Sequence, residues 1–155
     1  MIKVKALAWI ESNNYLFVVK NHDCIKSDDY YRPVGGGVEF GESTTASLHR
    51  ELNEELGTEI SIIGEALVLE NIFTCDGFPG HEIIYLYPSV FKHAEFNEHK
   101  VFKLTEANGE TYDALWIPIS EFLSGTLRLV PEALLERYRA LKQAATKITS
   151  DSSAQ

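Results

Sequence analysis

The sequence predicts a single α/β domain whose mixed β-sheet is covered by helices on both faces. Short runs of β-branched and aromatic residues stand on both sides of one strongly helical segment, and a second amphipathic segment follows near the C-terminus. With 155 residues, 45% of them hydrophobic, the chain has room for one domain with a sizeable core. We expect this domain to span residues 1–148, followed by a polar, disordered tail at residues 149–155.

Two strands are expected first, at Val4 to Trp9 and Tyr15 to Val19. The residues Glu-Ser-Asn-Asn between them form turns readily, so the two strands are predicted to make a hairpin. Asn21 to Tyr31 is polar and is predicted to be a loop. Pro33 to Gly37 is rich in glycine and is predicted to interrupt regular structure.

The segment from Ser43 to Gly57 has the spacing of an α-helix. Ser43 is expected to be the N-cap, and Gly57 ends the helix as a C-cap residue does. An apolar stripe that faces the core is formed by leucines four residues apart, namely Leu48, Leu52 and Leu56.

Strands are predicted again beyond this helix. Apolar runs at residues 60–63 and 66–69 flank Gly64, where a bend is expected. Asp76 to Gly80 is a strong turn sequence, followed by an expected strand from Glu82 to Phe91, in which Pro88 indicates an edge or a bulge.

The last third of the chain is predicted to hold one strand and one helix. Asn97 to Glu110 is a charged connection, and Tyr112 to Ile119 has the composition of a strand. Pro131 to Ala145 is predicted to be the final helix, with Pro131 near its first position.

Three glutamates, Glu51, Glu54 and Glu55, project from one side of the predicted helix. At 100° per residue they fall within an arc of about 100°. Such a cluster repels itself unless cations are present, and its oxygen ligands suit Mg²⁺, with Mn²⁺ as a substitute. The alternative is an ordinary solvated acidic face, which the spacing described below makes less favoured.

The chain carries 14 Lys plus Arg against 23 Asp plus Glu, a net charge of -9. This charge repels nucleic-acid backbones and acidic membranes, so neither extended nucleic acid nor a membrane is expected as a partner. The N-terminus shows no long apolar run, which predicts a cytoplasmic protein. Cys24 and Cys75 do not form a disulfide framework and are expected to be free and buried.

Residues Gly36 to Thr58 fit the pattern G-x5-E-x7-R-E-U-x-E-E-x-G-U, where U is a bulky aliphatic residue, at every position except the last. The matching residues are Gly36, Glu42, Arg50, Glu51, Leu52, Glu54, Glu55 and Gly57. This pattern resembles the Nudix box, the signature of hydrolases that cut a diphosphate linked to another moiety. Residues 114–122 are similar to the family's closing strand and helix. The resemblance implies an α/β/α sandwich.

The resemblance also implies roles for these residues. Arg50 would orient Glu51, and the carbonyl of Gly36 would join Glu51, Glu54 and Glu55 as a metal ligand. The glycines Gly35, Gly36 and Gly37 would let the backbone approach a phosphate. Either Glu51 or Glu54 would be the general base, and outside the box the candidate is Glu110, with Glu106, Glu82 and Asp113 as rivals.

Phe78 and His81 are the candidates for further substrate contacts. Phe78 lies in a Gly-Pro turn where it is hard to bury, and His81 follows this turn on the expected pocket rim. Other aromatic residues expected beside the cleft are Tyr30, Tyr31, Phe73 and Tyr85. None of them identifies the moiety attached to the diphosphate.

The resemblance therefore implies a Mg²⁺-dependent hydrolase that cleaves the pyrophosphate bond of a nucleoside diphosphate linked to another moiety, by water attack at phosphorus. A nucleoside triphosphate pyrophosphatase and a non-catalytic nucleotide sensor are the alternatives. The intact glutamates argue against the sensor, because a binding-only protein does not need all three. The oligomeric state is open, with a homodimer as one alternative because many relatives pair.

Overall fold

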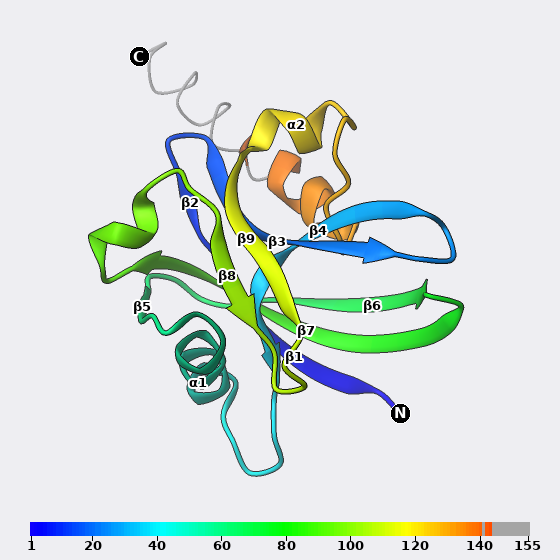
Figure 1. Cartoon of the computed structure of the whole chain (residues 1–155), viewed down its shortest axis with the longest axis horizontal. Helices are drawn as coiled ribbons and strands as arrows, with labels where there is room; N and C mark the ends of the chain where they lie inside the picture. The colour runs from blue at the N-terminus through cyan, green and yellow to red at the C-terminus, as the bar shows by residue number, and fades with distance from the viewer. Residues whose placement is uncertain (141, 144–155) are drawn as a thin grey trace, which may run out of the picture.

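The centre of the protein is a mixed sheet, seen in a computed structural model that describes residues 1–140 and 142–143. The strand order is β5-β7-β1-β4-β3-β9-β8, with β6 beside β7 and β2 beside β3 (Figure 1). The strands are β1 (Lys3–Trp9), β2 (Glu11–Ser12), β3 (Tyr15–Asp23), β4 (Asp28–Gly37), β5 (Ile60–Ile62), β6 (Leu67–Cys75), β7 (Phe78–Phe91), β8 (Phe102–Thr105) and β9 (Thr111–Pro118). β1 and β7 are parallel, whereas β1 and β4 are antiparallel, so the sheet is mixed as predicted.

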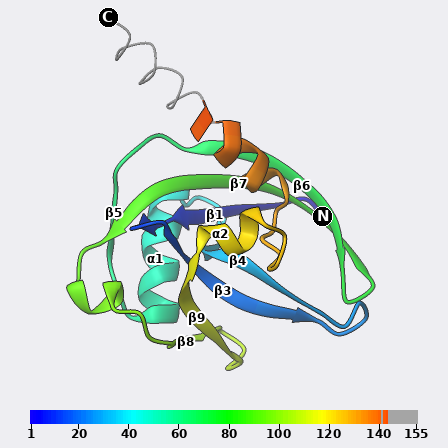
Figure 2. The same cartoon turned by 90° about the horizontal axis from the view of Figure 1, so that it is seen from above.

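Helices cover both faces of this sheet. α1 (Thr44–Leu56) lies on one face, and α2 (Ile119–Leu123) lies on the other with the helical residues 133–140 (Figures 1 and 2). Side chains alternate along the central strands between two buried clusters: Ala6 packs in the cluster that contains Leu48, and Leu7 packs in the cluster that contains Phe122. The expected α/β/α sandwich is confirmed.

The helix α1 forms where its sequence predicts. Ser43 Oγ accepts a hydrogen bond from the Ala46 amide at 3.1 Å, and Gly57 adopts a left-handed conformation with φ 63°. Leu48 and Leu52 are buried against the sheet, while Leu56 is half-buried. The apolar stripe thus fixes the rotation of the helix and decides which of its side chains face outward.

The predicted loop at residues 21–31 is wrong, because β3 continues to Asp23 and β4 begins at Asp28. Polar residues of the two strands pair with each other, for example Asn21 with Tyr30, so the sheet ladder continues without apolar alternation. The predicted interruption at Pro33 to Gly37 is also wrong. Gly35 lies inside β4, where an added Cβ would fall 2.8 Å from Leu7 Cα, so this glycine permits close packing of β1.

β7 is longer than predicted and is not an edge strand. It starts at Phe78, so the turn is confined to Asp76 and Gly77. Pro88 pairs with Trp9 of β1, and its carbonyl accepts from the Ile63 amide at 2.8 Å. The nitrogen of Pro88 points to the same side as this carbonyl, where β5 ends and β6 has not begun, so its missing N–H interrupts little of the ladder.

The predicted connection at residues 97–110 contains regular structure. A 3₁₀ turn (Ala94–Asn97) is followed by β8, which pairs with β9. The final helix begins at residue 133 instead of Pro131, and the tail at 149–155 lies outside the described residues. Cys24 and Cys75 are free, but the expected burial is wrong, because Cys24 is exposed and Cys75 is half-buried. Among the described helices, none has the length and apolar character needed to cross a bilayer.

Candidate active site

Arg50 on α1 holds three glutamates in place. Its Nε and Nη2 atoms donate to the two oxygens of Glu42 at 2.7 and 2.9 Å. Its Nη1 atom donates to Glu51 Oε1 and to Glu54 Oε2, both at 3.1 Å. The hydrogen bonds from Arg50 lower the pKa of Glu42 to about 2. The pairing of Arg50 with Glu51 is the one that the resemblance implied.

The glycine segment at the end of β4 is bound tightly to this helix. The Gly37 carbonyl accepts hydrogen bonds from Arg50 Nη2 and from the buried Ser47 Oγ, each at 3.1 Å. Gly36 lies against the Glu51 carboxylate, so that an added Cβ would fall 2.5 Å from Glu51 Oε2. The backbone of Gly36 and the Glu51 carboxylate therefore border the same small space.

We expect Gly36→Ala to destabilise the protein by about 1–3 kcal/mol, because the new methyl group must displace the Glu51 carboxylate. Urea unfolding of the metal-free protein measures this change. Gly37→Ala is the matched control, since a Cβ there meets nothing within 4 Å, and it should change the free energy of unfolding by less than about 0.5 kcal/mol. Equal effects at the two positions would contradict the contact with Glu51.

Glu55 is a half-buried acid on the same side of α1. Burial, a hydrogen bond with Glu51 and the negative charges of Glu51 and Glu106 raise the pKa of Glu55 to about 8. While no cation is bound, the Glu55 carboxyl thus keeps its proton more readily than an ordinary glutamate does. The oxygen atoms grouped here are hard ligands of the kind that a divalent cation such as Mg²⁺ prefers. These residues fit Mg²⁺ or Mn²⁺.

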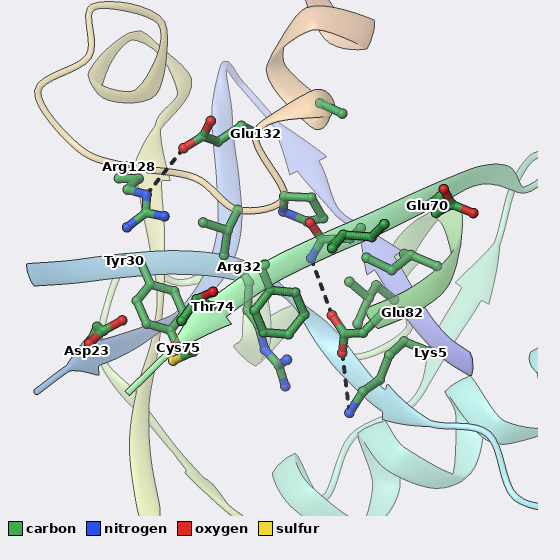
Figure 3. Close-up of a pocket in the computed structure, with 18 of the residues that line it drawn as sticks. Lys5, Asp23, Tyr30, Arg32, Glu70, Thr74, Cys75, Glu82, Arg128 and Glu132 are labelled. Carbon is green, nitrogen blue, oxygen red and sulfur yellow. Dashed lines mark hydrogen bonds and ion pairs between the residues drawn. The ribbon is translucent and has the colours of Figure 1, made fainter. Parts of the chain in front are cut away.

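A cavity of about 410 Å³ is lined by side chains of the sheet and of residues between Arg128 and Ala133, without a contribution from α1 (Figure 3). β6 and β7 form one wall, β1 and β4 form another, and residues 130–133 lie at the rim. Lys5 and Arg32 line this cavity. Glu51 raises the pKa of Lys5, and Arg32 lowers that of Glu55, although neither is the main influence on that group. Lys5 pairs in the sheet with Gly37, and Arg32 lies four residues before Gly36 on β4, so both cations stand near the glycine segment that contacts α1.

The comparisons with known proteins identify the family. A family model described as NUDIX domain matches residues 1–138. The chain belongs to the NUDIX domain family. No curated protein matches the chain.

Solved structures share this Nudix fold. The solution structure of the E. coli ORF135 protein matches with a TM-score of 0.57 and 25% identity, over 92% of each chain. A NUDIX hydrolase from Nitrosomonas europaea matches with a TM-score of 0.60 and 20% identity, over 90% of each chain. A NUDIX-family hydrolase from Clostridium perfringens matches with a TM-score of 0.55 and 15% identity, over 92% of this chain and 98% of that chain.

The structure gathers the residues of the Nudix box but not all of the other candidates. Glu110 is exposed on the turn between β8 and β9, where it accepts from Tyr112 Oη at 2.7 Å. Of the alternatives to Glu110 as general base, Glu106 raises the pKa of Glu55 and Asp113 forms an ion pair with Lys103. Glu82, the third rival, lines the cavity. The catalytic role of Glu110 stays a prediction.

Some of the candidates for substrate contact line the cavity and others do not. Phe78 is 76% exposed at the start of β7, and neither Phe78 nor His81 is among the residues that line the described cavity. Their role in binding stays a prediction. Tyr30 and Phe73 do line the cavity, whereas Tyr31 is buried against Phe122.

Sequence reasoning missed Lys5 and Arg32 as cavity residues. Each is a charged residue inside a β-strand with buried residues next to it. A charged residue within an apolar strand is the sequence feature that could have indicated a role in a cavity.

A second acidic group lies away from the Nudix box. In the described part of the chain, ligand atoms of Asp23, Cys75 and Asp76 lie within 4.8 Å of one another. The Asp23 carboxylate, however, already accepts hydrogen bonds from the amides of Ile25, Lys26 and Asp76 at 3.0, 3.0 and 3.3 Å. This carboxylate therefore ties two turns together.

Proposed function

We propose that this Nudix protein is a Mg²⁺-dependent hydrolase that cleaves the pyrophosphate bond of a nucleoside diphosphate linked to another moiety, by water attack at phosphorus. The observation that carries the proposal is the position of the acidic side of α1, fixed by Arg50 beside Gly36 of β4, the strand whose Arg32 lines the cavity. A diphosphate at this junction would have carboxylates on one side and room for its organic moiety on the other.

The residues that would hold the metal are the carbonyl of Gly36 and the carboxylates of Glu51, Glu54 and Glu55. Bound Mg²⁺ or Mn²⁺ would supply charge stabilisation on the diphosphate and a bound water of lowered pKa. The protein's contribution is to place these oxygens. The leucine stripe and the Arg50 network hold α1 against β4, so little reorganisation is needed at the moment of reaction.

A carboxylate of the same helix would accept the proton from the attacking water. Arg50 binds one oxygen of Glu51 and one of Glu54, which leaves the second oxygen of each free of Arg50. Glu54 is 59% exposed and Glu51 is 13% exposed, so a water reaches Glu54 more readily. Glu51 and Glu54 are thus both candidates for the general base, with Glu110 outside the helix.

A nucleotide panel tests the proposal. ADP-ribose, NADH, a UDP-sugar, a dinucleoside polyphosphate and the nucleoside triphosphates are incubated with the protein and Mg²⁺, and phosphate and pyrophosphate release are assayed separately. We expect a linked diphosphate to yield two monophosphates, with one ¹⁸O atom taken up from labelled water. EDTA should stop the reaction, and Mg²⁺ or Mn²⁺ should restore it.

Each rival gives a different result in the same panel. Pyrophosphate release from a nucleoside triphosphate, without cleavage of linked diphosphates, would indicate the pyrophosphatase. Nucleotide binding without any cleavage would indicate the sensor.

A further inference from the structure

Arg32 on β4 is a half-buried arginine whose guanidinium has no hydrogen-bond or ion-pair partner among residues 1–140 and 142–143 (Figure 3). The other partly buried arginines are paired: Arg50 binds glutamates, and Arg128 binds Asp28 at 2.9 Å. An arginine out of reach of full hydration normally finds a carboxylate or another acceptor. The guanidinium of Arg32 therefore has donors available for a ligand.

A second cation, Lys5, lies on the same side of the cavity. Figure 3 shows Lys5, Arg32 and Glu82 close together, with Lys5 Nζ 3.9 Å from Glu82 Oε2. Burial lowers the pKa of Lys5, and the positive charge of Arg32 lowers it further. Glu82 pairs with Lys5, whereas Arg32 forms no ion pair within residues 1–140 and 142–143. An anion would complete this group.

The position of the pair indicates which anion. Arg32 and Lys5 both line the cavity and stand beside the glycine segment of β4, because Arg32 lies on the same strand as Gly36, which borders Glu51, and Lys5 pairs with Gly37. A ligand that extends from this segment into the cavity would contact the two cations. In the substrate class proposed above, the group at this point is the phosphate that carries the organic moiety.

We propose that Arg32, assisted by Lys5, binds the phosphate of the substrate that is bonded to the moiety in the cavity. The planar guanidinium of Arg32 can donate two parallel hydrogen bonds to phosphate oxygens, and Lys5 adds a point charge. This assignment rests on the proposed function and extends it, because it selects substrates that carry a phosphate next to the cavity. The rival explanation is that Arg32 serves only as a counter-ion for Glu55.

Binding of a diphosphate that water cannot cleave tests the assignment. Isothermal titration calorimetry measures the affinity of the full chain for Mn²⁺ alone, and then for methylenediphosphonate in the presence of Mn²⁺. Arg32→Ala should weaken methylenediphosphonate binding about 10- to 100-fold while the Mn²⁺ affinity changes less than about threefold. Arg32→Lys should recover part of the loss, since it keeps the charge but not the two parallel donors.

A charge-matched control separates a local effect from the change in net charge. Arg139 is exposed outside the cavity and donates to the Leu123 carbonyl at 2.8 Å. Arg139→Ala should change methylenediphosphonate affinity by less than about twofold. Should Arg32→Ala fail to fold, Arg32→Gln keeps most of the side-chain stem and carries the same test.

Two outcomes would overturn the assignment. Unchanged methylenediphosphonate affinity in the Arg32 variants would remove it. Loss of Mn²⁺ and methylenediphosphonate affinity in proportion would show that Arg32 acts through Glu55. Because the binding assay needs no turnover, it reports on Arg32 even if the nucleotide panel shows no cleavage, so the two proposals fail separately.

Discussion

Replacing Glu55 with glutamine should lower kcat about 10²- to 10³-fold and leave the fold intact. The variant keeps the shape of the protonated acid but cannot supply a negative oxygen to a metal ion. The rate is measured with the best substrate of the nucleotide panel, and circular dichroism reports the fold. Glu136→Gln changes an exposed glutamate of the helical residues 133–140 and should leave kcat within about twofold.

The same variant has a second, independent readout. In the metal-free protein Glu55 titrates at about 8 instead of the ordinary 4.5, so between these pKa values the folded state holds a proton that the unfolded chain has released. The folded state is therefore favoured at low pH, and the free energy of unfolding should fall as pH rises through this range. Glu55→Gln should flatten that dependence in urea titrations with EDTA. Identical pH dependences for the two proteins would contradict the raised pKa, and a near-normal rate would contradict the metal assignment.

Arg50→Ala should impair both stability and turnover. The change leaves Glu42, Glu51 and Glu54 without their shared cation and removes a donor from the Gly37 carbonyl. We expect a loss of about 1–3 kcal/mol in the free energy of unfolding, since the group is only partly buried, and about a 10²-fold lower kcat. Urea unfolding and steady-state kinetics measure the two effects.

High ionic strength and the variant Arg50→Lys serve as controls for this prediction. High ionic strength should reduce the loss of stability, because the repulsion among the remaining carboxylates is screened. Arg50→Lys keeps the charge but cannot bind both oxygens of Glu42 in parallel, so it should recover only part of each effect. Full recovery with lysine would show that the positive charge alone is sufficient. An Arg50→Ala protein with unchanged stability and kcat would contradict the role of the Arg50 hydrogen bonds.

The sequence predicts the helix and the contact of Arg50 with Glu51 well because the signals are local. Ser43 and Gly57 act on backbone groups within a few residues, and the leucine spacing sets which side of α1 faces the sheet. The carboxylates then follow from the helical repeat. The same local character allows Arg50 to be paired with Glu51 from the motif alone.

The rest of the site depends on pairings between distant segments. The ends of β3 and β4 are polar, so no apolar alternation marks them, and their register is set by the partner strand. Lys5 and Arg32 stand on different strands, and only the completed sheet brings both to the cavity. Glu106 acts on the pKa of Glu55, while Glu110 accepts a hydrogen bond from Tyr112, and the sequence around these two glutamates does not indicate this arrangement.

The cavity draws its lining from segments as far apart as Lys5 and Ala133, whereas the proposed metal ligands all lie between Gly36 and Glu55. If the proposed function holds, a change in β6 or at residues 130–133 would alter which compounds bind without touching the proposed metal ligands. Selectivity and metal binding would then respond to replacements at different residues of the chain.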